Sequence, residues 1–142
     1  MRPAAAARGA ATADEAIAGL LAAARAGDVA QAAGLFPSAA VLASALSCPS
    51  GSELAGRYGE DAVKATLKAE LAGLAGLGLA RRAPERDASE TVAVGAELGG
   101  CRATAPLRLE KVGVVLRDGG GREAPEVLRF AVIGERWYLL RL

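Results

Sequence analysis

The stretch that decides the fold is Val112–Leu142, which reads VGVVLRDGGGREAPEVLRFAVIGERWYLLRL. It holds three apolar runs, which are divided by a glycine-rich turn at Asp118–Gly121 and by a tight turn at Gly134–Glu135. Apolar runs that are separated by such turns are typical of antiparallel hairpins. The sequence therefore predicts that this part of the chain forms a β-meander.

Strand signals also precede this meander. Apolar residues recur at every second position over residues 91–98, which predicts a half-buried strand, and Gly99–Gly100 predicts a hairpin turn. The next strand is expected from about 102 to 117, but its apolar positions change parity near Glu110–Lys111. A parity change of this kind is expected at a β-bulge, which bends a strand. We therefore predict a curved, four-stranded antiparallel sheet.

The first half of the chain carries helix signals. Thr12–Glu15 is a capping box that begins a helix, and Gly27 followed by Asp28 ends it and caps a second, short helix. Ser38 is expected to cap a further helical turn or two. A longer helix is predicted over about 61–77, because apolar residues recur there at steps of three and four. The charged segment 80–89 is interpreted as the connector to the sheet.

These elements predict an α+β fold with N-terminal helices packed on the sheet. We expect residues 14–142 to form a single domain, since neither half has a full core by itself. Residues 1–13, MRPAAAARGAATA, lack the apolar centre of a secretory signal. Three interpretations remain open for them, namely a disordered start, the remainder of a removed targeting segment, or a misplaced start; we favour the disordered start.

Composition excludes several classes of function. The chain of 142 residues has a net charge of +1 with scattered positive charges, which is not the footprint of a nucleic-acid-binding protein. No apolar run reaches the ~18–20 residues that cross a bilayer, so no transmembrane segment is expected. The chain has no histidine, which excludes Ser–His–Asp and Cys–His catalysis and removes the commonest transition-metal ligand. We predict no catalytic residue, no metal site and no cofactor.

The two cysteines are predicted to form a disulfide. Cys48 and Cys101 both lie beside turn residues, and neither belongs to a CxxC motif or to a periodic apolar run. A disulfide between them would join the helical half to the sheet and would indicate an oxidising compartment, the periplasm or the cell exterior. A cytoplasmic protein with two free thiols is the alternative.

Two stretches resemble a known superfamily. Ala16–Phe36, AIAGLLAAARAGDVAQAAGLF, is similar to an opening helix pair with an A-x-x-x-G-D turn, and Phe130–Leu140, FAVIGERWYLL, is similar to a closing hairpin with a Trp-Tyr pair. The pattern resembles the nuclear-transport-factor-2-like superfamily, which includes SnoaL-like and ketosteroid-isomerase-like proteins. The resemblance implies a cystatin-like cone with an open mouth.

The resemblance does not imply one activity, because members of the superfamily use the cone for catalysis, ligand carriage or protein docking. Members that depend on a pocket histidine are excluded as models for this chain. The isomerase-like members pair a carboxylate base with a tyrosine or a protonated acid. This chain has Tyr58 and Tyr138, but no motif aligns them with an acid, so no catalytic residue is carried over.

Five residues are weak candidates for ligand contact. Glu97 is a base if it points into a cone, and Glu110 lies at the expected bulge, but an outward-facing glutamate is favoured for both. Arg129 is a candidate for binding an anionic ligand, and the favoured alternative is an arginine exposed on the face of the sheet. Trp137 is a candidate for lining a ligand pocket, but packing in the core is favoured. Tyr58 is a candidate for a position at the mouth of the cone, and the alternative is that its side chain covers the start of a helix.

We therefore predict a non-catalytic module that binds a small apolar ligand or a protein partner. One alternative is a small isomerase or hydrolase that uses a buried carboxylate in the cone. The other is a structural homodimer that packs sheet on sheet.

Overall fold

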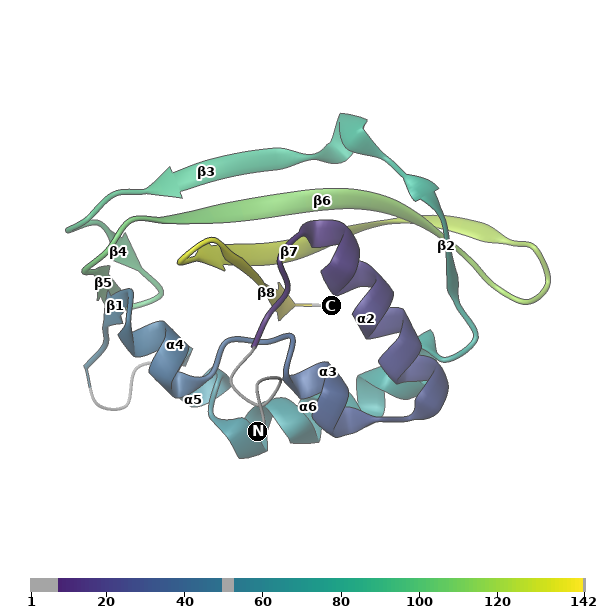
Figure 1. The fold of residues 1–142 in the computed structure, drawn as a ribbon, viewed down its shortest axis with the longest axis horizontal. Helices are drawn as coiled ribbons and strands as arrows, with labels where there is room; N and C mark the ends of the chain where they lie inside the picture. Colours follow the sequence, from purple (N-terminus) through teal and green to yellow (C-terminus); the bar gives the residue numbers. More distant parts are fainter. Residues whose placement is uncertain (1–7, 50–52, 142) are drawn as a thin grey trace.

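The computed structural model describes residues 8–49 and 53–141. The chain has the predicted α+β class, with helices in its first half and antiparallel sheets in its second half. In Figure 1 the helices gather on one side of the long strands, and β3 (Ala88–Val92) forms the opposite border of the sheet. The helices therefore leave one edge of the sheet uncovered.

Three helices begin at the predicted caps. The side chains of Thr12, Asp28 and Ser38 accept hydrogen bonds of 3.0–3.1 Å from backbone amides three residues further on. Gly27 ends the first helix in the left-handed conformation, with φ of 66°. The helices are α2 (Ala13–Ala26), α3 (Val29–Ala33), α4 (Ala39–Ala43), α5 (Glu53–Arg57) and α6 (Glu60–Leu74).

Two helical features differ from the prediction. The short helix α5 was not predicted, because its five residues are too few to show a helical period. Helix α6 ends at Leu74 rather than at Leu77. Gly73, Gly76 and Gly78 explain the earlier end, since glycine is a poor helix former.

The main sheet has five antiparallel strands rather than the predicted four. β6 (Leu107–Arg117) and β7 (Glu123–Ile133) form a long central hairpin, and β8 (Arg136–Arg141) pairs with β7. β2 (Gly78–Arg82) and β3 share the outer edge of β6, β2 along residues 114–117 and β3 along residues 107–111. The segment 80–89, predicted to be a connector, thus contains parts of two strands and the 3-10 turn η1 (Pro84–Arg86).

A second, three-stranded sheet lies at one end of the long hairpin (Figure 1). It contains β1 (Leu46–Ser47), β4 (Glu97–Leu98) and β5 (Cys101–Ala103). The predicted strand over 91–98 is divided by a turn in which the Ala96 amide donates to the Ala93 carbonyl oxygen. The predicted strand over 102–117 is divided before Leu107, since Pro106 has no amide hydrogen for a ladder.

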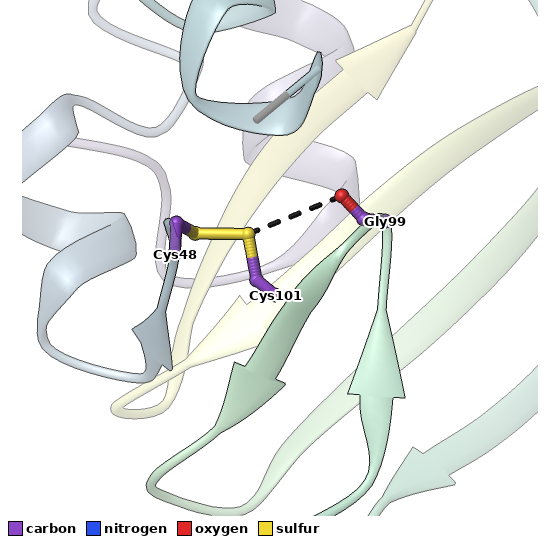
Figure 2. The surroundings of a disulfide bond; sticks show 3 residues. All are labelled: Cys48, Gly99 and Cys101. Atoms are coloured by element: carbon purple, nitrogen blue, oxygen red, sulfur yellow. Dashed lines mark hydrogen bonds between the residues drawn. A yellow bond between two sulfur atoms is a disulfide. The ribbon is translucent and has the colours of Figure 1, made fainter. Parts of the chain in front are cut away.

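The predicted disulfide joins this second sheet to the helical half. Cys48 and Cys101 are bonded, with a Cα–Cα distance of 4.3 Å (Figure 2). Cys48 follows β1, and Cys101 begins β5 directly after the Gly99–Gly100 turn. Both glycines of that turn have positive φ, as the hairpin signal predicted. The disulfide prediction is confirmed.

The predicted bulge at Glu110–Lys111 is wrong. Glu110 pairs with Ser89 and Phe130, and Lys111 pairs with Ala88 and Arg129, with no shift in either ladder at this point. The apolar residues of β6 change parity because a different face of the strand is covered at each end. The register shifts lie instead within β2 and at the step between Arg129 and Phe130 along the β7–β8 pair.

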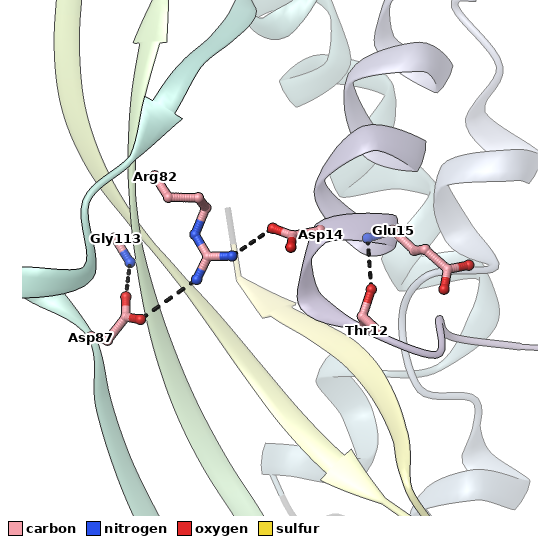
Figure 3. Close-up of polar contacts among 6 residues, drawn as sticks. All are labelled: Thr12, Asp14, Glu15, Arg82, Asp87 and Gly113. Carbon is pink, nitrogen blue, oxygen red and sulfur yellow. Dashed lines mark hydrogen bonds and ion pairs between the residues drawn. The ribbon is translucent and has the colours of Figure 1, made fainter.

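A polar cluster fixes the outer edge of the sheet to α2 (Figure 3). Arg82 contacts Asp14 of α2 at 2.5 Å and Asp87 at 3.5 Å. The other carboxylate oxygen of Asp87 accepts a 2.8 Å hydrogen bond from the amide of Gly113 in β6. The Ala83 amide donates to the carbonyl oxygen of Gly113, also at 2.8 Å. The break between β2 and β3 is therefore itself held against the centre of β6.

The edge of β8 is covered by the start of the described chain. The amide of Ala10 donates to the Trp137 carbonyl oxygen, and the amide of Trp137 donates to the Ala10 carbonyl oxygen. Arg136 donates to the carbonyl oxygens of Arg8 and Gly9. The prediction of a disordered start concerned residues 1–13; residues 1–7 lie outside the described residues, whereas residues 8–10 are tied to β8 by these bonds.

Candidate functional site

An apolar hollow of about 210 Å³ lies among residues that flank both cysteines, and we call it the disulfide-side hollow. Leu46 lies two residues before Cys48, and Leu98 lies three residues before Cys101. The opposite wall is the sheet. The principal apolar lining residues are Leu42, Leu46, Leu54, Leu98, Leu107 and Ile133.

The position of this hollow explains the parity change in β6. Leu107 and Leu109 share one face of the strand, and both line the disulfide-side hollow. Val112, Val114 and Leu116 share the other face and are buried. The parity change therefore arises because opposite faces of one regular strand are covered at its two ends.

Tyr58 is one of three polar residues that line the hollow, together with Arg57 and Arg129. The tyrosine is buried, with 4% of its surface exposed. Its hydroxyl donates a 2.6 Å hydrogen bond to the carbonyl oxygen of Leu140 in β8. This bond fixes α5 and the start of α6 against the last strand, so Tyr58 has a structural role in the wall of the hollow.

Arg129 lies at the boundary between two hollows. It lines the disulfide-side hollow and also an adjoining hollow of about 360 Å³, and both hollows include Leu109 and Leu140. Lys111 lines the adjoining hollow and is the direct cross-strand partner of Arg129. We call Lys111 and Arg129 the basic pair.

Neither member of the basic pair forms an ion pair in the part of the chain that the structure describes. Both side chains are exposed, and neither forms a hydrogen bond or an ion pair with residues 8–49 or 53–141. Arg141 is the direct register partner of Arg129 on β8. Like charges that lie directly opposite on neighbouring strands destabilise a sheet. The arrangement therefore has an electrostatic cost that the fold itself does not offset.

The two candidate glutamates lie in different environments. Glu97 is exposed on the short strand β4. Glu110 is half-buried, and its carboxylate accepts hydrogen bonds from the Ser89 hydroxyl at 2.8 Å and from Arg108 Nε at 2.9 Å. Strand alternation points the Glu110 side chain to the face opposite Leu109. The structure thus brings Tyr58 and Arg129 to one hollow but does not pair either glutamate with a tyrosine there.

Trp137 packs in the sheet rather than in the disulfide-side hollow. It is half-buried, and its ring meets Phe130 edge to face with a centroid distance of 5.5 Å. The guanidinium carbon of Arg108 lies 6.0 Å from the ring centroid of Trp137, within the range of a cation–π contact. The tryptophan therefore stabilises the β7–β8 pair.

A second apolar hollow, of about 310 Å³, lies between α2, α6 and the far end of the β6–β7 hairpin, and we call it the α2–α6 hollow. Its charged lining residues are both acidic, Glu70 and Glu126. Its principal apolar lining residues are Ile17, Leu20, Leu74, Leu77, Leu116 and Leu128. The two hollows thus differ in the sign of the charge at their borders.

The fold and these hollows define the chain as an α+β protein whose helices and antiparallel sheets border open apolar hollows. None of the helices in the described part is both long enough and apolar enough to span a membrane. No family model matches the chain, and neither a curated protein nor a solved structure matches it. The site is therefore interpreted from its own geometry.

Proposed function

We propose that this protein is a non-catalytic module that binds a small apolar ligand in the disulfide-side hollow. The observation that carries the proposal is the composition of the wall, which is built from segments far apart in the chain and is fastened by the Cys48–Cys101 bond. Small-molecule sites are mostly apolar, largely preformed spaces of about 300–1,000 Å³. The disulfide-side hollow has the mostly apolar lining of such a site, and the adjoining hollow, with which it shares Leu109, Arg129 and Leu140, adds further volume.

The polar groups at this hollow, in the part of the chain that the structure describes, favour binding over turnover. A carboxylate base in an isomerase or hydrolase must lie within hydrogen-bond reach of the substrate proton that it removes. Glu110 instead accepts hydrogen bonds from Ser89 and Arg108, and Glu97 is exposed on β4. The hydroxyl of Tyr58 is engaged by the Leu140 carbonyl oxygen. The polar groups near the hollow are thus suited to holding a ligand and its walls in place.

The proposed fold family is the nuclear-transport-factor-2-like cone, and the proposed location is an oxidising compartment such as the periplasm or the cell exterior. Helices that precede an antiparallel sheet with a long central hairpin support the family assignment. The disulfide supports the location, since such bonds persist in oxidising compartments.

Binding of the neutral fluorescent probe N-phenyl-1-naphthylamine tests the proposed function. Leu54→Gln places an amide in the wall of the disulfide-side hollow, and we expect it to weaken probe binding about tenfold because apolar contact is lost. The matched control is Leu79→Gln, which alters an exposed leucine on β2 and is expected to leave the affinity unchanged. Absence of probe binding, or equal affinity in both variants, would contradict the proposal.

A further inference from the structure

The basic pair places two positive charges beside the disulfide-side hollow, and an uncharged ligand would not pair with them. Lys111 and Arg129 lie directly opposite each other on neighbouring strands, and no acidic group in the described part of the chain pairs with either. An anion placed between them would turn a repulsion into two charge-assisted contacts. A guanidinium also matches a carboxylate with two parallel hydrogen bonds.

The basic pair adjoins the apolar wall directly. Leu109 lies two residues before Lys111 on the same face of β6, and Ala131 lies two residues after Arg129 on the same face of β7. Alternate residues of a strand are about 7 Å apart. Both Leu109 and Ala131 line the disulfide-side hollow. A molecule whose charged end rests on the basic pair therefore reaches the hollow within one side-chain spacing.

We propose that the ligand of this hollow is an anionic amphiphile, of the class of an aliphatic carboxylate with about eight carbons, whose head contacts Lys111 and Arg129. This inference rests on the proposed function and adds the chemistry of the ligand. The charged residues that line the disulfide-side hollow, Arg57 and Arg129, are both basic, which supports it. Of the two acids that line the adjoining hollow, Glu110 pairs with Arg108, whereas Glu90 lies on the same face as Lys111 and opposes the binding of an anion.

The α2–α6 hollow shows the opposite preference, which gives the inference an internal comparison. Its charged lining residues are Glu70 and Glu126, so it repels a carboxylate at neutral pH. Apolar area alone favours neither hollow. The sign of the border charge therefore determines where an anionic amphiphile binds.

Displacement of bound N-phenyl-1-naphthylamine at low salt tests the inference with two competitors of equal chain length, octanoate and 1-octanol. We expect octanoate to bind about tenfold more tightly than 1-octanol, because charge-assisted contacts form only with the carboxylate. Arg129→Gln and Lys111→Gln are each expected to remove most of this preference by weakening octanoate binding more than 1-octanol binding. The matched control Arg25→Gln, at the exposed end of α2, is expected to keep the preference.

The outcomes separate the inference from the function on which it rests. If 1-octanol and octanoate displace the probe equally well, or if both basic-pair variants keep the preference for octanoate, the anionic class of ligand is wrong while apolar binding stands. If the probe itself does not bind to the wild-type protein, both the inference and the proposed function are wrong. Because Lys111 and Arg129 are exposed, both variants are expected to fold, and thermal unfolding checks this.

Discussion

Gly113 is the residue at which the fold depends most clearly on the absence of a side chain. A β-carbon at this position would lie 2.3 Å from the Ala83 carbonyl oxygen and 2.7 Å from Cβ of Arg86. The first of these atoms belongs to the backbone that connects β2 to η1, so it cannot move aside without breaking the hydrogen bonds around Asp87. The connection between β2 and β3 can therefore approach β6 this closely only because residue 113 is glycine.

We predict that Gly113→Ala lowers the free energy of unfolding by about 2 kcal/mol, as expected for overpacking against backbone. Urea denaturation measures the change. The control is Gly73→Ala, since Gly73 is in α6 with open space around it, and alanine there is expected to stabilise the protein by up to about 1 kcal/mol. Equal effects of the two substitutions would contradict the close approach at Gly113.

Glu123 supplies a pH-dependent contribution at the residue scale. Its carboxylate accepts hydrogen bonds from Arg117 and from Arg81, and these lower the pKa of Glu123, the bond from Arg117 having the larger effect. A lowered pKa in the folded state means stabilisation that is present above the ordinary glutamate pKa and is lost as the pH falls through the lowered value.

We therefore predict that Glu123→Gln lowers Tm at pH 7 and that the difference from wild type disappears at about pH 2. Because Glu123 lies at the surface, the effect is expected to be small. Differential scanning calorimetry at the two pH values measures it. Glu85→Gln is the control, since that exposed carboxylate forms no hydrogen bond or ion pair with residues 8–49 or 53–141. A constant Tm difference for Glu123→Gln at both pH values would rule out the ion pairs as its cause.

At the scale of elements, local signals in the sequence predicted local structure correctly. Thr12, Asp28 and Ser38 cap helices, and Gly99–Gly100 and Gly134–Glu135 form hairpin turns, because each signal acts within a few residues. Parts of β2 and β3 lie in the charged segment 80–89, where exposed and half-buried side chains show no apolar alternation. Their positions depend on pairing with β6, which is a long-range property.

The disulfide is the covalent element that holds the wall of the candidate site. It closes a loop with a sequence separation of 53, for which the chain-entropy model gives about 4 kcal/mol of stabilisation. We predict that the double substitution Cys48→Ala/Cys101→Ala lowers the free energy of unfolding by about this amount, as measured by urea denaturation. Dithiothreitol is expected to destabilise the wild type by a similar amount and to leave the double variant unchanged. A double variant as stable as the wild type would show that the end sheet is held without the bond.

At the scale of the whole molecule, the sequence predicted the α+β class but not the hollows. Leucines such as Leu42, Leu54 and Leu107 have the same pattern whether they fill a core or line a space, so no sequence signal separates the two roles. The basic pair could not be predicted from the sequence either. Arg129 was a candidate, but its opposition to Lys111 follows from the register of β6 and β7, and the expected bulge would have displaced that register.

The central claim is that a small anionic amphiphile binds in the disulfide-side hollow, and the two isoleucines of the chain allow one direct measurement. Ile133 lines the disulfide-side hollow, and Ile17 lines the α2–α6 hollow. With isoleucine δ1-methyl labelling, a titration with octanoate is predicted to shift the NMR signal of Ile133 in a saturable way and to leave that of Ile17 in place. A saturable shift of Ile17 alone, or no shift of either signal, would contradict the account.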